Sequence, residues 1–296
     1  MSNTTVWDNP YDHPSLLKRV ATPILRCLYR VLPEAVYDAI YFPAFNFYQK
    51  SIRAAYSQKI KKARTTGDTR GVMKMERVFK VMKHSLVGSP GLEHTHDLAQ
   101  EVVDNKVPGA FVECGVAQGG CAALMAQVAC SNEADRDCWF FDSYEGLPDP
   151  TEADFESGKT GRHIRPLPKG SCLGTLKQVS ELLFEEMELP KDKINLVKGW
   201  FENTLPKTTS AIGPIALLRA DGDWYESTRC ILENLYDQVA EGGHVIIDDY
   251  CSCYGAKKAT DEFLNEKGVH VSLVPDGRGG ASFQKPKNAE IIRKAS

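Results

Sequence analysis

Four aspartates stand directly after two apolar stretches in the second half of this 296-residue chain. Asp221 and Asp223 flank one glycine after the run IALLRA, and Asp248 and Asp249 follow the run HVII. Several carboxylates in one cleft raise each other's pKa unless a cation neutralises them, and a hard divalent cation takes oxygen ligands. If Asp221, Asp248 and Asp249 converge, they predict a magnesium site. The alternative is that each aspartate only caps a helix or ends a strand.

Two buried strands joined by a helix would bring these aspartates together. Both apolar runs are typical of strands in a parallel sheet. Apolar residues recur at helical spacing between the runs, and Gly242 and Gly243 follow as the expected helix stop. A βαβ crossover lays its two strands parallel, so both carboxyl ends emerge at the same edge of the sheet. The sequence therefore predicts that the carboxylates meet at that edge.

A glycine-rich turn follows another apolar stretch, residues 110–112. Glu113 comes first, and Gly115, Ala117 and Gly119 then alternate with other residues before a helix of small side chains. Such a turn lets the backbone approach a ligand, and the helix N-terminus offers free N–H groups. The spacing departs from the dinucleotide pattern GxGxxG. It resembles the first motif of S-adenosylmethionine-dependent methyltransferases, with Ala117 at the middle glycine, although a plain tight turn is the alternative.

Two later stretches extend the predicted ligand site. Asp142 ends the next apolar run, where an acid can accept hydrogen bonds from ribose hydroxyls. The Gly- and Pro-rich loop that follows, through about residue 172, is long enough to be a lid over the ligands. Trp200 and Phe201 follow the third predicted strand and either flank an adenine ring or belong to the core.

Composition limits the class of protein. With 42% hydrophobic residues the chain can bury one large core, and a formal charge of -3 with a pI near 6.2 gives no general attraction to nucleic acid or to anionic membranes. Nine cysteines without a CxxC pair are expected to be reduced, mostly buried thiols. No apolar run has the length of a membrane span, and no signal-peptide pattern is present. We expect a cytoplasmic protein with a small-molecule partner.

The chain divides into two expected parts. Residues 1–71 predict an N-terminal helical extension, extended at first and then interrupted by Pro23, Pro33 and Pro43, and residues 72–296 predict one α/β domain. Basic and aromatic residues in the extension leave a membrane-surface role open. Because acidic residues accompany them, we favour packing on the main domain or on a second copy of the chain, which would make a homo-oligomer.

Five segments, in this order, resemble the macrocin and mycinamicin O-methyltransferase (TylF) family between about residues 85 and 287: FVECGVAQGG, FFDSYEGLPDP, VKGWFENTLP, LLRADGDWYEST and GGHVIIDDY. The resemblance implies the Rossmann-like, doubly wound α/β fold of class I methyltransferases, with a mostly parallel seven-stranded sheet. It also implies transfer of a methyl group from S-adenosylmethionine to a hydroxyl of a sugar or similar diol-bearing small molecule, with Mg²⁺ as a second cofactor.

The resemblance assigns roles to single residues. Asp221, Asp248 and Asp249 are expected as metal ligands and Asp223 as the general base. The expected cofactor contacts are Glu113, Gly115, Ala117, Gly119, Asp142, Ser143, Gly199 and Trp200. A sugar hydroxyl is a poor nucleophile until its proton is removed. In an extended strand end, Asp221 and Asp223 would point to the same side, so that one binds metal while the other takes the proton. His84 and His163 are the next candidates for the base.

Two other classes of protein remain open from the residues. A nicotinamide-dependent oxidoreductase would explain the glycine-rich turn and Asp142, but it leaves the paired aspartates without a role. A non-catalytic nucleotide-binding protein would lack a catalytic group, and none is missing here.

Overall fold

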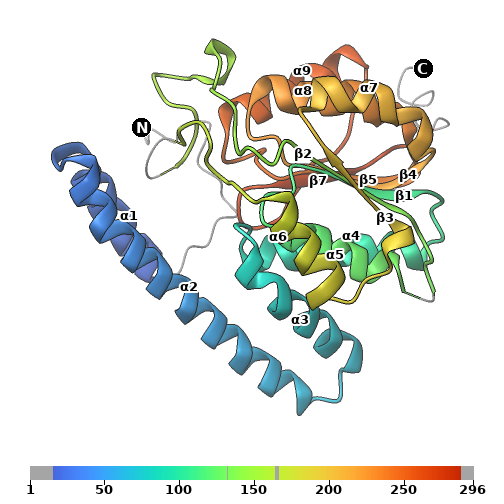
Figure 1. Cartoon of the computed structure of the whole chain (residues 1–296), viewed down its shortest axis with the longest axis horizontal. Coiled ribbons are helices and arrows are strands. Elements are labelled where there is room, and N and C mark those ends of the chain that lie inside the picture. The colour runs from blue at the N-terminus through green and yellow to red at the C-terminus, as the bar shows by residue number, and fades with distance from the viewer. Residues whose placement is uncertain (1–15, 132, 164–166, 288–296) are drawn as a thin grey trace.

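A seven-stranded sheet forms the centre of the computed structural model, which describes residues 16–131, 133–163 and 167–287 (Figure 1). The strand order is β3-β2-β1-β4-β5-β7-β6. Strands β1 to β5 are parallel, while β7 is antiparallel to both β5 and β6. The strands are β1 (Ala110–Cys114), β2 (Cys138–Asp142), β3 (Ile194–Lys198), β4 (Ile215–Ala220), β5 (Val239–Ile247), β6 (Val274–Pro275) and β7 (Ala281–Gln284). The predicted doubly wound, mostly parallel α/β fold is confirmed.

Helices cover both faces of the sheet (Figure 1). One face carries α3 (Thr69–Val81), α4 (Ser89–Asp104), α5 (Gly120–Ala129) and α6 (Leu176–Ser180), which continues as a π-helix over Glu181–Glu186. The other face carries α7 (Phe201–Ile212), α8 (Tyr225–Leu235) and α9 (Tyr254–Glu266). Short 3₁₀ turns lie at Met82–His84, Glu152–Asp154, Lys191–Lys193 and Tyr236–Gln238. Alternate strand residues face opposite layers: Phe111 packs with α3 to α5, and Val112 packs with α7 to α9.

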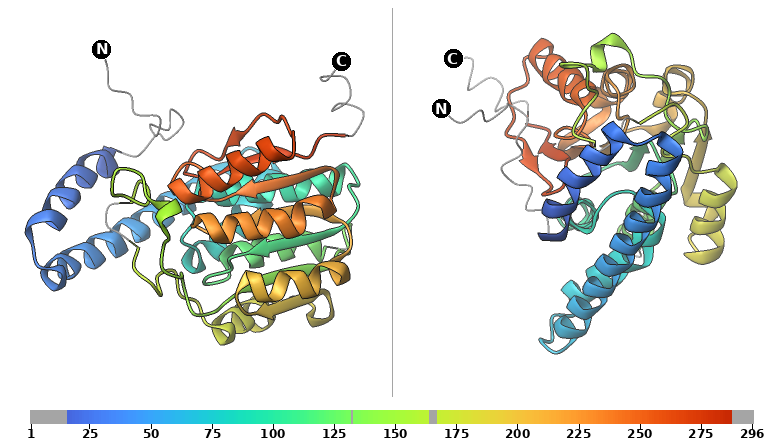
Figure 2. Two further views of the ribbon diagram at one scale, coloured as in Figure 1. Left: turned by 90° about the horizontal axis from the view of Figure 1, so that it is seen from above. Right: turned by 90° about the vertical axis from the view of Figure 1, so that its left-hand side faces the viewer.

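The N-terminal extension is a pair of long helices, α1 (Leu16–Val31) and α2 (Glu34–Arg64), that project beyond the sheet and its helices (Figures 1 and 2). The prediction of short helices broken at three prolines is wrong at Pro23 and Pro43, which lie inside α1 and α2. A proline removes one hydrogen bond and bends a helix, but packing on both sides of it can hold the turns together. Here Tyr41 and Phe45 stack across Pro43 with ring centroids 5.9 Å apart.

Both helices of the extension contact the main body. Near its C-terminal end α2 buries Tyr56 and Ile60 in the core beside α3. In α1, Arg26 Nη2 donates a hydrogen bond of 3.0 Å to the Arg162 carbonyl in the long loop after β2. No helix in the described part of the chain combines the length and the apolar character that crossing a bilayer requires. Residues 1–15, which are expected to be extended, lie outside the described residues.

The predicted βαβ unit is confirmed as β4, α8 and β5, with β4 and β5 parallel. The prediction that Gly242 and Gly243 end the helix of this unit is wrong. The chain leaves α8 at Leu235, passes through the 3₁₀ turn and enters β5 at Val239, so Gly242 and Gly243 lie inside the strand. They are accommodated there because Lys285, just after β7, accepts a hydrogen bond from the Gly242 N–H and donates one to the Gly243 carbonyl.

Candidate active site

The carboxyl ends of the parallel strands open into one pocket. Its walls include ten of the twelve predicted site residues: Glu113, Gly115, Ala117, Asp142, Ser143, Trp200, Asp221, Asp223, Asp248 and Asp249. Gly119 and Gly199 do not line it. Gly119 faces Val179 and Leu182, and the Gly199 N–H donates to the Asp142 carbonyl at 2.9 Å. The topology therefore brings together segments from β1, β2, β4, β5 and the start of α7.

Gly115 is required by the chain's own packing. Its φ is +94°, and a Cβ atom there would lie 1.8 Å from the backbone oxygen of Asp221. The Asp221 N–H in turn donates to the Cys114 carbonyl at 2.8 Å. A glycine therefore lets β1 and the loop after β4 approach each other closely. Substitution here would disturb the fold as well as the pocket, so Gly115 is an unsuitable probe of ligand binding.

Asp142 shapes the glycine-rich turn. Its Oδ2 accepts hydrogen bonds from the Val116 and Ala117 N–H groups at 2.7 and 2.9 Å, and its Oδ1 accepts one from Tyr144 N–H at 2.6 Å. The neighbouring Ser143 hydroxyl oxygen accepts the Glu145 N–H at 3.1 Å. A carboxylate offers about four lone-pair sites, so Asp142 has room for one further donor.

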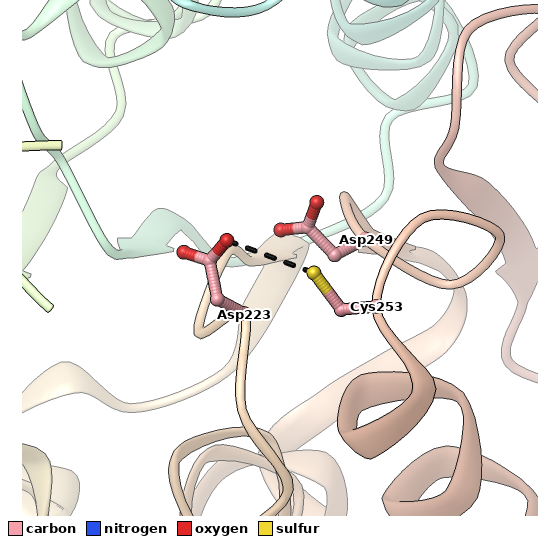
Figure 3. Close-up of side chains that lie close together, drawn as sticks. All are labelled: Asp223, Asp249 and Cys253. Carbon is pink, nitrogen blue, oxygen red and sulfur yellow. Dashed lines mark hydrogen bonds between the residues drawn. The ribbon is translucent and has the colours of Figure 1, made fainter. Parts of the chain in front are cut away.

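The aspartates converge. Asp221, Asp248 and Asp249 each offer an oxygen atom within 4.8 Å of the other two. Asp223 lies against Asp249 in a second group with Cys253 (Figure 3). The expected geometry of Asp223 is wrong, however. Strand β4 ends at Ala220 and Asp223 has φ +53°, so a left-handed turn, and not an extended strand, directs its carboxylate into the pocket.

Two arginines that the sequence analysis missed contact these acids. Arg219, 1% exposed in β4, donates from Nε to Glu113 Oε1 at 2.9 Å and from Nη2 to Asp221 Oδ2 at 2.9 Å. The same Nη2 lies 2.7 Å from Asp248 Oδ1 without hydrogen-bond geometry, and Arg278 Nη1 donates to Asp248 Oδ2 at 3.0 Å. Five carboxylates, including Glu113, thus face two guanidinium groups. With every group ionised, their net charge is -5 + 2 = -3.

The excess of carboxylates over arginines affects the pKa values of the aspartates. Burial raises the pKa of Asp221, Asp223 and Asp249, and neighbouring carboxylates raise them further. Burial also opposes ionisation of Asp248, but Arg219 and Arg278 outweigh it and lower its pKa. Such a site holds more acid than its own arginines neutralise.

Glu113 combines a buried ion pair with a free oxygen. Burial raises its pKa to about 8, and the attraction of Arg219 offsets only part of that effect. Its Oε2 atom is buried and has no hydrogen-bond partner among the described residues, although Glu113 lines the pocket. An unsatisfied buried acceptor costs free energy until a donor arrives, so this oxygen suits a ligand with an N–H or ammonium group.

The alternative role of Asp223, capping a helix, belongs to another residue. Helix α8 begins at Tyr225, and its N–H donates to Asp154 Oδ1 at 2.6 Å. Asp154 comes from the loop after β2, and its other oxygen accepts the Thr151 N–H at 2.7 Å. This loop also brings Leu147 and His163 to the pocket wall.

His84 and His163, the two histidines considered as alternative bases, differ in their surroundings. His84 lines the pocket but pairs with Glu186, with Nε2 3.0 Å from Oε2. His163 lies with Nε2 3.3 Å from Cys253 Sγ. Neither contact involves Asp223.

Aromatic side chains from the N-terminal extension also reach the pocket. Tyr41 and Phe45 of α2 line the pocket, as does Phe201 from the main body. No sequence pattern ties residues 41 and 45 to a site near residue 221. Arg219 did carry a signal, because a charged residue inside the apolar run IALLRA must find an acidic partner when buried.

Comparison with known proteins gives consistent matches. The family model described as Macrocin-O-methyltransferase (TylF) matches residues 23–284. Demethyldecarbamoylnovobiocin O-methyltransferase of Streptomyces niveus is 35% identical over 206 residues, 69% of this chain and 76% of that protein. Mycinamicin III 3''-O-methyltransferase of Micromonospora griseorubida is 27% identical over 70% of this chain and 80% of its own. The solved structure of the O-methyltransferase NovP has a TM-score of 0.61 and 33% identity, covering 69% of this chain and 83% of NovP.

Proposed function

Because the chain belongs to the macrocin O-methyltransferase (TylF) family and is therefore an O-methyltransferase, we propose that it methylates a sugar hydroxyl on a small natural product. S-adenosylmethionine is the proposed methyl donor and Mg²⁺ the proposed second cofactor. One observation carries the proposal: the glycine-rich turn after β1 and the aspartate group after β4 and β5 line the same pocket. The family match favours this activity over a nicotinamide-dependent oxidoreductase and over a non-catalytic binding protein.

The cofactor is proposed to bind over the turn at residues 115–119. The free Oε2 of Glu113 would accept from the ammonium group of the methionine part, and Asp142 would accept from a ribose hydroxyl with its remaining lone pair. Trp200 lines the same pocket beside them and offers a ring face for the adenine. Ser143 and Gly199 support this region through the turns they form, and Gly119 through its contact with the helix at residues 176–186.

The aspartate group fits a hard divalent cation. Its oxygen atoms lie within 4.8 Å of each other, and with every group ionised the site has a net charge of -3 before any ion is added. Asp221, Asp248 and Asp249 would hold the ion, with Arg278 keeping Asp248 in place. When bound, Mg²⁺ lowers the pKa of a hydroxyl that it coordinates and fixes the direction of that oxygen.

Asp223 is the proposed general base. It is buried, so water is largely excluded around it, and burial together with the nearby Asp249 and Asp248 raises its pKa, so that it holds a proton more strongly than an exposed aspartate does. S-adenosylmethionine would supply the methyl group, whose bond to sulfur would break as the bond to the acceptor oxygen forms, leaving the neutral thioether S-adenosylhomocysteine. Asp223 would accept the hydroxyl proton.

The acceptor is proposed to carry an apolar ring next to its sugar. Tyr41 and Phe45 from α2 and Leu147 and Leu167 from the loop after β2 supply apolar side chains to the pocket lining. Aromatic and aliphatic side chains favour flat apolar groups, because both surfaces leave water together. The domain boundary near residue 71, assembly through the N-terminal helices and a cytoplasmic location stay predictions.

Calorimetry with S-adenosylhomocysteine, followed by a screen of glycosylated aromatic acceptors, tests the proposal. We expect binding of S-adenosylhomocysteine, methyl transfer in the presence of Mg²⁺, loss of turnover in EDTA and recovery when Mg²⁺ is restored. Full turnover in EDTA would remove the metal from the proposal. Binding of NAD without binding of S-adenosylhomocysteine would remove the cofactor assignment.

A further inference from the structure

The hairpin formed by α1 and α2 carries an apolar surface that is exposed to solvent. Of the twelve exposed large apolar side chains among the described residues, seven lie between residues 20 and 47. Side chains at spacings of four and seven residues lie on one face of a helix. Each helix has one exposed apolar stripe with these spacings: Val20, Ile24 and Val31 on α1, and Val36, Ile40 and Phe47 on α2.

Other faces of the two helices hold the hairpin together and face the pocket. Tyr29 of α1 and Tyr37 of α2 pack edge to face, with ring centroids 5.2 Å apart. Tyr41 and Phe45 of α2 line the active-site pocket. The apolar stripes therefore stay on the outside of a hairpin that projects beyond the sheet and its helices (Figures 1 and 2).

The hairpin is also strongly basic. Residues 20–64 contain eight Lys and Arg but only two Asp and Glu, which gives a formal charge of +6. Because the whole chain carries -3, the remaining residues carry -9, and the overall charge conceals this separation. Lys50 and Lys61 are exposed and continue the line of the α2 stripe at the same helical period. Neither of them, nor Arg30 or Lys62, has an acidic partner among the described residues.

We propose that the α1–α2 hairpin binds the surface of an anionic phospholipid bilayer. The apolar stripes enter the boundary between head groups and acyl chains, and the Lys and Arg side chains beside them contact lipid phosphates. Each helix is apolar on one exposed face only, so the hairpin lies along the interface. This combination of an apolar stripe and flanking positive charge is typical of helices that bind membranes from one side.

A second copy of the chain fits this surface less well. In a symmetric dimer the same face of both copies meets, so two hairpins of charge +6 would be brought together. The acidic main body of another copy would match the charge but not the stripes, because its exposed large apolar side chains are scattered through the sequence: Met73, Leu86, Phe155, Leu173 and Val274. An anionic bilayer offers negative charge and a continuous apolar layer together.

Co-sedimentation with phospholipid vesicles tests the proposal without any activity measurement. We expect the full chain to bind vesicles made of equal parts of phosphatidylcholine and phosphatidylglycerol, not to bind phosphatidylcholine vesicles, and to be released as NaCl is raised. Replacing Lys50 and Lys61 together by glutamine should lower the partition coefficient about 25-fold, since each Lys near an anionic membrane contributes roughly fivefold. The matched control replaces Lys177 and Lys191, exposed lysines of the main body, and should bind as the parent does.

Phe47→Ser tests the apolar stripe. It should lower the partition coefficient at least about tenfold, because burial of a phenylalanine side chain contributes that much or more. Val274→Ser, which changes an exposed apolar residue of β6, should bind as the parent does. Phe47, Lys50 and Lys61 are exposed, so their variants should melt at the parent's temperature, and thermal melts check this.

Three outcomes separate this proposal from its alternatives. Absence of binding to the mixed vesicles, or equal binding to both kinds of vesicle, would overturn it. A dimer in light scattering that Phe47→Ser dissociates would assign the stripe to a second copy and would also overturn it. Vesicle binding by a protein that transfers no methyl group would leave the membrane surface standing and reject only the proposed function.

Discussion

Replacing Asp223 and Asp221 separately by asparagine tests whether neighbouring carboxylates have different roles. Asp223→Asn keeps the side-chain shape, and asparagine is among the residues that tolerate the positive φ of +53° found there. The substitution leaves Asp221, Asp248 and Asp249 unchanged, and their oxygens lie within 4.8 Å of each other in the parent. We therefore expect Asp223→Asn to bind Mg²⁺ and S-adenosylhomocysteine as the parent does but to lose turnover.

The size of the loss follows from the chemistry. Removal of a proton-transfer group typically costs 10²–10⁴-fold in rate, which is roughly 3–5 kcal/mol of activation free energy. Helix α8 should keep its stability, because its first N–H is bound by Asp154 and not by Asp223. Removing the Asp223 carboxylate should leave the melting temperature in EDTA unchanged or raised, since burial and the neighbouring carboxylates oppose its ionisation and raise its pKa.

Asp221→Asn should behave differently. It removes a metal oxygen, so magnesium affinity should fall and turnover should recover in part at high Mg²⁺. Initial rates across a magnesium titration, calorimetry with S-adenosylhomocysteine and thermal melts of both variants decide the matter. Turnover of Asp223→Asn within tenfold of the parent, or recovery of that variant by excess Mg²⁺, would refute the assignment of the base.

Three further predictions follow from other contacts. Arg219→Met should lower the free energy of unfolding by about 3–5 kcal/mol in urea denaturation, because it leaves buried carboxylates unpaired; a change below 1 kcal/mol would contradict that role. Phe45→Ala should raise the acceptor KM roughly 2- to 12-fold without changing cofactor affinity, whereas Phe47→Ala, 68% exposed on the same helix, should change neither. Asp154→Ala should cost about 1 kcal/mol of stability through the lost Tyr225 cap, and an unchanged melting temperature would show that this cap contributes nothing.

The local pattern of the sequence was sufficient for the sheet and for the position of the aspartates. Continuous apolar runs separated by a helical repeat predict parallel strands, and parallel strands place their carboxyl ends at one edge. Asp221, Asp248 and Asp249 meet there, as this rule requires. The helix stop at Gly242 and Gly243 failed because their pairing with Lys285, more than forty residues away, holds them in β5.

Contacts between distant segments decided the rest. The capping of α8 by Asp154 and the approach of His163 to Cys253 both depend on how the loop after β2 packs on the loops after β4 and β5. Residue types and spacing fix which groups can reach the edge of the sheet, because strand direction is a local property repeated along the chain. Which groups touch at that edge is set by loop packing and by the balance of five buried carboxylates against two arginines, and no local pattern encodes that balance.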